Sequence, residues 1–223
     1  MFTAKGALKL RMGRSEEARS EPPAKEAYHH GDLRRALLDA TLRLVEQHGP
    51  QGFTLRAAAR AAGVSPGAPY HHFEDKDALL AAVAEEGFEL FGAALREAAE
   101  KPAPIPRLRA QNVGVAYVLF AIDHPTRFRV MVGYGVQSRM QHGKLAGAAL
   151  SAYQLVRDVL VEGLKGRQVE PISEADILGW WSIVHGLAFL AIDGHLGKTG
   201  ASSKRAEALV RQVITALAKG DRR

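Results

Sequence analysis

Apolar residues recur at steps of three and four along most of the chain, which is the spacing that buries one face of a helix. In the segment 32–48 this spacing is formed by Leu33, Leu37, Ala40 and Leu44, and in 203–219 by Ala206, Leu209, Val210, Val213, Ile214 and Leu217. No stretch shows the sustained two-residue alternation that is typical of a strand. The sequence therefore predicts an all-α fold.

Capping residues and breakers divide this pattern into helices. Asp32 is a suitable N-cap for the first helix, which Gly49-Pro50 would end, and Thr54 is suitable for a short second helix that ends at Gly63. After a short third element near residues 65–73, helices are expected over about 75–100, 107–123, 126–135, 144–164, 174–196 and 203–219. Three prolines in residues 101–106 form a stiff break between two of them.

Composition limits the class of protein. The 223 residues include no cysteine, which excludes disulfides, thiolate nucleophiles and cysteine-based zinc sites. The net charge of +6 favours an anionic partner such as nucleic acid. The beginning of the chain lacks the apolar run of a secretory signal, and the most apolar stretch, 177–192, is shorter than the roughly 20 residues that span a bilayer. We therefore expect a cytoplasmic protein with no membrane partner and a helix at 177–192 that is buried on most sides.

Residues 1–26 mix charged residues, serine and proline without periodicity, and we expect a flexible tail there. Basic residues in such a tail can contact DNA phosphates, but a solvated tail is the simpler expectation. Met12 leaves open whether Met1 or Met12 is the natural start.

The stretch AGVSPGAPYHHF, residues 62–73, has two possible interpretations. Gly63-Val64-Ser65-Pro66-Gly67 matches G-x-S-x-G, the nucleophile elbow of serine hydrolases, but an elbow needs a buried strand before it. The residues before Gly63 are TLRAAARAA, whose alanines favour a helix. An enzyme built around Ser65 is therefore the weaker hypothesis.

The second interpretation is a helix-turn-helix. Gly63 would end one helix in the left-handed conformation, and Ser65 would cap the next helix with Pro66 in its first position. Pro69 is awkward there because it removes a backbone donor, so this element is expected to begin as an irregular or 3₁₀ helix, anchored by Val64, Tyr70 and Phe73. Two short helices joined by a tight glycine turn can place the second helix in a major groove.

This part of the sequence resembles the TetR/AcrR family of transcriptional regulators, whose pattern is roughly T-x-x-x-I-A-x-x-A-G-V-S-x-G-x-x-Y-x-x-F-x-x-K-x-x-L. The matching residues are Thr54, Ala59, Ala62, Gly63, Val64, Ser65, Gly67, Tyr70, Phe73, Lys76 and Leu79. Ala58 departs from the usual isoleucine, and Pro69 stands where a larger side chain is common. Further along, WSIVHG, with Trp181, His185 and Gly186, resembles the C-terminal domain type named for its Trp-His-Gly signature.

The resemblance implies three parts: the tail 1–26, a DNA-binding domain over 27–75 built from a three-helix helix-turn-helix, and a helical effector-binding and dimerisation domain over 76–223. Thr54, Tyr70 and Lys76 are expected to contact phosphates, and Arg56 a phosphate or a base edge. The residues expected in the groove are Ser65, Pro66, Gly67, Ala68 and His71. The first four are small and offer few hydrogen bonds, so Arg56, His71 or the shape of the DNA must supply more of the specificity.

The charge of the predicted DNA-binding domain is nearly balanced. Between residues 28 and 76, six arginines and lysines face five acidic residues. Strong binding then depends on two copies acting together and on further contacts from the N-terminal tail. The low charge and Pro69 also leave one alternative open, which is a ligand-binding or scaffold protein whose helix-turn-helix has degenerated.

The C-terminal half has candidate residues for a ligand pocket, and the alternative for each is a plain core position. These candidates are Tyr117, Phe120, Phe128, Met131, Tyr134, Trp180, Trp181 and His185. Arg127 and Arg139 are candidates for an acidic group of a ligand, although a solvated face is the simpler expectation. Adjacent His71 and His72 cannot face one ion on a helix, so we expect no metal and no cofactor.

These observations together predict a non-enzymatic, ligand-responsive regulator. The resemblance implies a homodimer that binds a palindromic DNA operator, most simply as a repressor. We expect the two copies to pair through the last two helices, because the apolar stripes of 177–192 and 206–217 need burial. A small, largely apolar effector would release it. The sequence leaves the effector, the operator, the regulated genes, the sign of regulation and the effect of Pro69 open.

Overall fold

The computed structural model describes residues 30–133, 135–164, 172–196 and 203–220. Within these ranges the chain folds into helices and contains no strand, which confirms the all-α prediction. The elements are α1 (His30–His48), α2 (Leu55–Ala61), the 3₁₀ helix η1 (Ala68–His71), α3 (Lys76–Glu100), α4 (Pro106–Asp123), α5 (Pro125–Val132), α6 (Val136–Arg139), α7 (Leu145–Leu164), α8 (Glu174–Ile192) and α9 (Ser203–Gly220). The predicted tail, residues 1–26, lies outside the described residues.

Most helix ends follow from the capping residues that the sequence contains. The Thr54 hydroxyl accepts a hydrogen bond from the Ala57 amide at 3.2 Å, and the Asp75 carboxylate accepts one from Ala78 at 2.7 Å. Gly49 and Gly63 have φ angles of 73° and 72°, the left-handed conformation expected where α1 and α2 end. The prediction of Asp32 as the first N-cap is wrong, because α1 begins two residues earlier, at His30.

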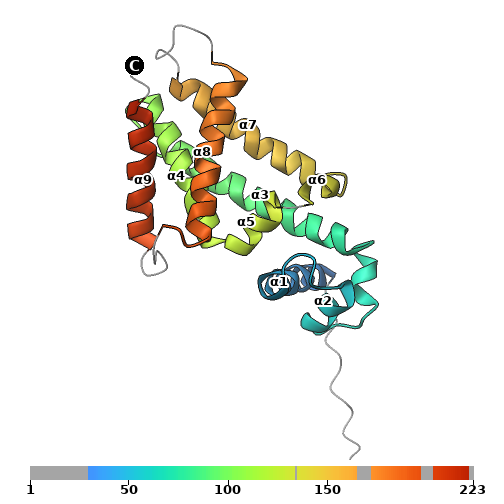
Figure 1. The fold of residues 1–223 in the computed structure, drawn as a ribbon. Helices are drawn as coiled ribbons and strands as arrows, with labels where there is room; N and C mark the ends of the chain where they lie inside the picture. Colours follow the sequence, from blue (N-terminus) through green and yellow to red (C-terminus); the bar gives the residue numbers. More distant parts are fainter. Residues whose placement is uncertain (1–29, 134, 165–171, 197–202, 221–223) are drawn as a thin grey trace, which may run out of the picture.

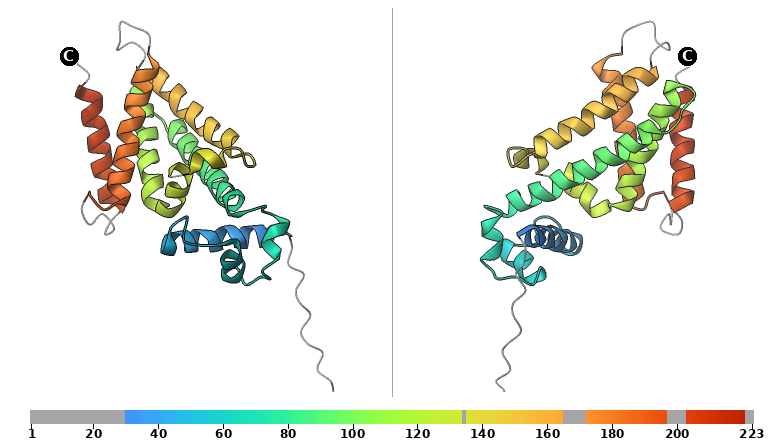
Figure 2. Two further views of the ribbon diagram at one scale, coloured as in Figure 1. Left: turned by 45° about the vertical axis from the view of Figure 1, so that its right-hand side comes forward. Right: turned by 180° about the vertical axis from the view of Figure 1, so that it is seen from behind.

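The buried apolar residues form two clusters, and α3 belongs to both. The smaller cluster joins α1 and α2 to the first half of α3 through Leu37, Leu55, Phe73, Leu79 and Val83. The larger cluster joins the second half of α3 to α4, α5, α7, α8 and α9. Figures 1 and 2 show α3 running from the α1–α2 end into the main helical body. One long helix therefore connects the two cores directly, and the division at residue 75 stays a prediction.

Helix α8 is the one described helix that is long and apolar enough to cross a membrane. A single helix of this kind is weak support for a membrane span, since core helices of soluble proteins have the same composition. Only 28% of its most apolar window is buried within the chain, so the expectation that it is buried on most sides is wrong for a single copy. It packs on α4, and α9 lies beside it at the edge of the molecule (Figures 1 and 2).

Candidate functional site

The first candidate site is the turn between α2 and η1. The Val64 amide donates to the Ala59 carbonyl at 3.0 Å, and the Ala68 amide donates to the Ser65 carbonyl at 3.0 Å. Ser65 follows a helix, so the strained strand-to-helix corner of a hydrolase is absent at this position. The prediction that Ser65 caps the next helix is also wrong: the N-cap of η1 is Gly67, and no side chain caps it.

Pro69 has the effect that the sequence predicts. It stands at the start of η1, and the element is a 3₁₀ helix rather than an α-helix. Val64 and Phe73 pack into the smaller core as expected, but Tyr70 does not, because 54% of its surface is exposed. Pro69 itself is buried.

The predicted DNA-binding residues lie close together at the α2–η1 end of the molecule, and most are exposed. The exposed ones are Thr54, Arg56, Ser65, Pro66, Gly67, Tyr70 and His71, whereas Ala68 and Lys76 are half-buried. The Thr54 hydroxyl accepts from Ala57 and keeps its own proton for another acceptor. Lys76 donates to the Gln51 side chain at 3.1 Å and lies 5.7 Å from the Phe53 ring, which holds it at this edge with further donors available.

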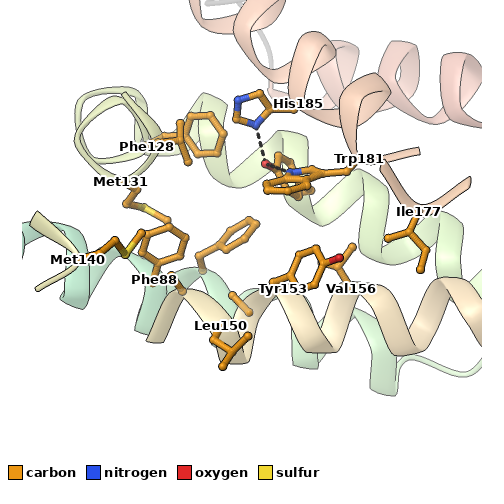
Figure 3. A pocket seen from close by; sticks show the side chains of 15 residues that line it. Phe88, Phe128, Met131, Met140, Leu150, Tyr153, Val156, Ile177, Trp181 and His185 are labelled. Carbon is orange, nitrogen blue, oxygen red and sulfur yellow. Dashed lines mark hydrogen bonds between the residues drawn. The ribbon is translucent and has the colours of Figure 1, made fainter. Parts of the chain in front are cut away.

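The second candidate site is a cavity of about 450 Å³ among α3, α4, α5, α7 and α8. Figure 3 shows aromatic and apolar side chains pointing toward it from several helices. Its lining consists of Phe88, Phe91, Tyr117, Phe128, Met131, Val132, Met140, Ala149, Leu150, Ala152, Tyr153, Val156, Ile177, Trp181 and His185. Volume and lining both fall in the range of small-molecule sites.

The structure brings five of the predicted ligand residues to this cavity: Tyr117, Phe128, Met131, Trp181 and His185. Two others lie elsewhere. Phe120 packs against Phe91 and His124, with ring centroids 5.2 and 4.8 Å away, and does not line the cavity.

Trp180 also points away from the cavity. Its ring lies against Gly114 of α4, where an added Cβ would come within 2.9 Å of it. Consecutive residues of a helix face about 100° apart, which separates Trp180 from Trp181. Tyr134 lies outside the described residues.

A hydrogen-bonded chain of three side chains forms one wall of the cavity. The Trp181 indole N–H donates to the Tyr117 hydroxyl at 3.1 Å, and that hydroxyl lies 2.8 Å from His185 Nδ1. If Tyr117 donates to Nδ1, the hydroxyl proton of the buried Tyr117 and the indole proton of Trp181 are both used in hydrogen bonds, and the remaining imidazole N–H belongs to the half-buried His185. The opposite tautomer would leave a phenol proton unpaired in the interior, so we assign the first arrangement.

Burial keeps both titratable members of this chain neutral. It raises the pKa of Tyr117 to about 12, because desolvation of the phenolate outweighs the hydrogen bond from Trp181. Burial also lowers the pKa of His185 from its ordinary value of 6.5, which favours the neutral imidazole.

The lowered pKa of His185 predicts a pH dependence of stability. The unfolded chain binds this proton more readily, so the free energy of unfolding should fall as the pH drops through 6.5 toward the lowered pKa. Urea denaturation at pH 8.0 and at successively lower pH values measures the loss. In His185→Phe this part of the pH dependence should vanish, and an unchanged slope in that variant would contradict the assignment.

Neither candidate arginine reaches the cavity wall, and neither is solvated. Arg127 is 8% exposed and lies 3.2 Å from a Glu86 oxygen. Arg139 is 1% exposed and lies 3.5 Å from Asp77. Both guanidinium groups are therefore paired with carboxylates of α3. Among the described residues, no group of three or more histidine and acidic side chains could hold a metal ion.

Sequence reasoning missed the part of the cavity that α3 and α7 supply. Phe88 and Phe91 on α3, and Leu150, Tyr153 and Val156 on α7, follow helical spacing like any core stripe. The aromatic residues among them were the available signal, but spacing alone does not distinguish a cavity wall from a packed core.

Comparison with known proteins connects both sites to one family. Residues 37–83 match the family model described as bacterial regulatory proteins, tetR family, and residues 108–217 match the tetracyclin repressor-like C-terminal domain. A curated HTH-type transcriptional regulator BetI from Burkholderia mallei is 44% identical over 82 residues, which are 35% of this chain and 42% of the relative. The match thus spans less than half the length of that regulator.

Solved structures resemble a larger part of the chain. A protein with unknown function from Rhodococcus sp. RHA1 is 32% identical, with a TM-score of 0.64 over 85% of this chain and 97% of its own. A bacterial regulatory protein in the tetR family, from Rhodococcus RHA1, has a TM-score of 0.65 at 21% identity, over 82% of this chain and 94% of its own. At this low identity, the similarity to the second structure shows a shared fold only.

Proposed function

The chain belongs to the TetR family of bacterial regulatory proteins, and we propose that it is a homodimeric, ligand-responsive transcriptional repressor of a palindromic operator. One observation supports DNA binding most directly: the residues expected to contact DNA gather at the α2–η1 end of the molecule. The family is one of regulators, so this chain is not an enzyme.

The exposed end of α2 and η1 suits contact with a phosphate backbone. The free hydroxyl of Tyr70, the hydroxyl proton of Thr54 and the ammonium group of Lys76 are donors to phosphate oxygens. Arg56 projects from α2 as a cation for a phosphate or a base edge. The small residues from Ser65 to Ala68 allow the backbone of η1 to approach the groove closely.

Dimerisation would cover the apolar face of α8 that the single chain leaves open. Leu178, Ile183 and Leu190 are 56%, 40% and 47% exposed, and Gly179 and Gly186 lie among them with open space where a Cβ would stand. Small residues between apolar ones allow two helices to pack closely. A second copy that pairs through α8 and α9 would bury this face and place two helix-turn-helix units on one operator.

A bulky residue at Gly186 should therefore weaken the dimer. We expect Gly186→Leu to raise the dimer dissociation constant at least about tenfold, because the new side chain separates the two copies of α8. Sedimentation velocity over a concentration series measures this constant. Gly147→Leu is the matched control, since Gly147 is also an exposed helical glycine with open space at its Cβ, but on α7. Equal dimerisation of both variants would place the interface elsewhere.

The cavity is the proposed effector site, for a small and largely apolar molecule. It lies beside α3, the helix that also packs against α1 and shares the smaller core with α2, so a ligand that shifts α3 would move the helix-turn-helix. A coupling free energy of about 1–3 kcal/mol is enough for regulation. The Trp-His-Gly type of the C-terminal domain, the division 1–26, 27–75 and 76–223, and a cytoplasmic location are parts of the same proposal.

Selection of random duplex DNA against the purified protein, at near-physiological salt, tests the proposal. A palindromic consensus whose binding is lost in Lys76→Ala is the expected result. Weak binding without a consensus, unchanged in that variant, would instead favour a ligand-binding or scaffold protein with a degenerate helix-turn-helix. The balanced charge of residues 28–76 is the observation that keeps this second candidate in consideration.

A further inference from the structure

The wall of the cavity contains no formal charge. Of its fifteen residues eleven are apolar, and the other four are Tyr117, Tyr153, Trp181 and His185. This inference rests on the proposal that the cavity is the effector site. We infer that the cavity selects its ligand by charge. It binds an uncharged ligand and rejects the carboxylate or ammonium analogue with the same carbon skeleton.

Three of the four polar side chains of the wall are already hydrogen-bonded to one another. Trp181 donates to Tyr117, and Tyr117 lies at hydrogen-bond distance from His185. Among the buried polar atoms without a hydrogen-bond partner in the described residues, none belongs to the cavity wall. The wall therefore has no buried donor or acceptor that requires a charged partner from the ligand.

The cations nearest in sequence to wall residues are paired with carboxylates. Arg127 precedes Phe128 of the wall, but its side chain meets Glu86 on α3. Arg139 precedes Met140 of the wall and lies near Asp77. No arginine or lysine lines the cavity, so a ligand carboxylate finds no cation in its wall.

An ammonium ligand meets the same obstacle. The acidic partners of the two arginines, Glu86 and Asp77, do not line the cavity, and neither does any other carboxylate. A carboxylate moved from water into such surroundings loses its hydration without compensation, and for an ammonium group the attraction to the faces of aromatic rings offsets only part of that loss. The aromatic wall, by contrast, gains from any apolar surface that leaves water.

The test compares three ligands with one chain length: methyl octanoate, octanoate and octylammonium. Trp180→Phe leaves Trp181 as the single tryptophan, and Trp181 lines the cavity, so its fluorescence reports binding in the full-length protein. Calorimetric titration of the unmodified protein covers any binding to which the fluorescence is insensitive. No DNA is present, so failure here is distinguishable from failure of the operator selection.

At pH 7.5 we expect the ester to bind and both ions to bind at least about tenfold more weakly. A substitution at the edge of the cavity supplies the converse result. Leu150 lines the cavity and is 54% exposed, so Leu150→Lys should fold and should raise the affinity for octanoate several-fold, while Leu150→Met should not. Equal affinities for the ester and the ions, no binding of any of the three, or an unchanged octanoate affinity in Leu150→Lys would overturn the inference.

Discussion

Replacing Tyr70 with phenylalanine is expected to weaken operator binding at least about tenfold, with no change in the free energy of unfolding. The variant loses only a hydroxyl on a side chain that is 54% exposed. A hydrogen bond to a charged acceptor such as phosphate contributes about 1.5–3 kcal/mol, and a dimer would lose two. Fluorescence anisotropy with the selected duplex measures the loss.

Tyr153→Phe is the matched control for this prediction, because it removes a hydroxyl from the cavity wall instead. In the absence of ligand its operator affinity should equal that of the unmodified protein. Equal affinities for Tyr70→Phe and Tyr153→Phe would show that Tyr70 makes no hydrogen bond to DNA.

Replacing Glu86 with glutamine is expected to lower the free energy of unfolding by about 3–5 kcal/mol, because it leaves a buried guanidinium without its counter-charge. Glu86 on α3 lies 3.2 Å from Arg127 of α5 and 2.6 Å from Arg35 of α1. The side chains of Arg127 and Glu86 are only 9% and 17% exposed. Urea denaturation measures the loss.

Two further variants distinguish the buried pair from the surface pair. The Arg35 side chain is 61% exposed, so Arg35→Ala should cost less than about 1 kcal/mol. The double variant Glu86→Gln with Arg127→Met should recover most of the lost stability, since no unpaired charge then remains. If Glu86→Gln lowered the free energy of unfolding no more than Arg35→Ala does, the stabilising role of the buried Glu86–Arg127 pair would be contradicted.

The sequence predicted the secondary structure well where local rules decide it. Thr54 and Gly63 act through the backbone of their own neighbours, so their roles are visible in the sequence alone. Pro69 is similar, because its ring restricts the helix in which it stands. The prediction that Ser65 is the N-cap was wrong because the element that follows is a 3₁₀ helix containing Pro69, and its N-cap is Gly67.

The site in the C-terminal half was predicted only in part, because it depends on how distant helices pack. Trp180 and Trp181 are adjacent residues of the same type, but the ring of Trp180 packs against Gly114 whereas the ring of Trp181 lines the cavity. The pairing of Arg127 with Glu86 joins residues 41 positions apart, and no local pattern indicates it. The absence of charge from the cavity wall likewise could not be predicted from the sequence, because it depends on where the side chains of Arg127 and Arg139 lie.

The measurement that tests the account most directly compares two duplexes: the selected palindrome, and the same duplex with one half-site scrambled. If two helix-turn-helix units act together in one dimer, the intact palindrome should bind at least about a hundredfold more tightly at near-physiological salt. Gly186→Leu should reduce this advantage, whereas Gly147→Leu should not. Equal affinity for both duplexes would contradict a dimeric operator-binding regulator.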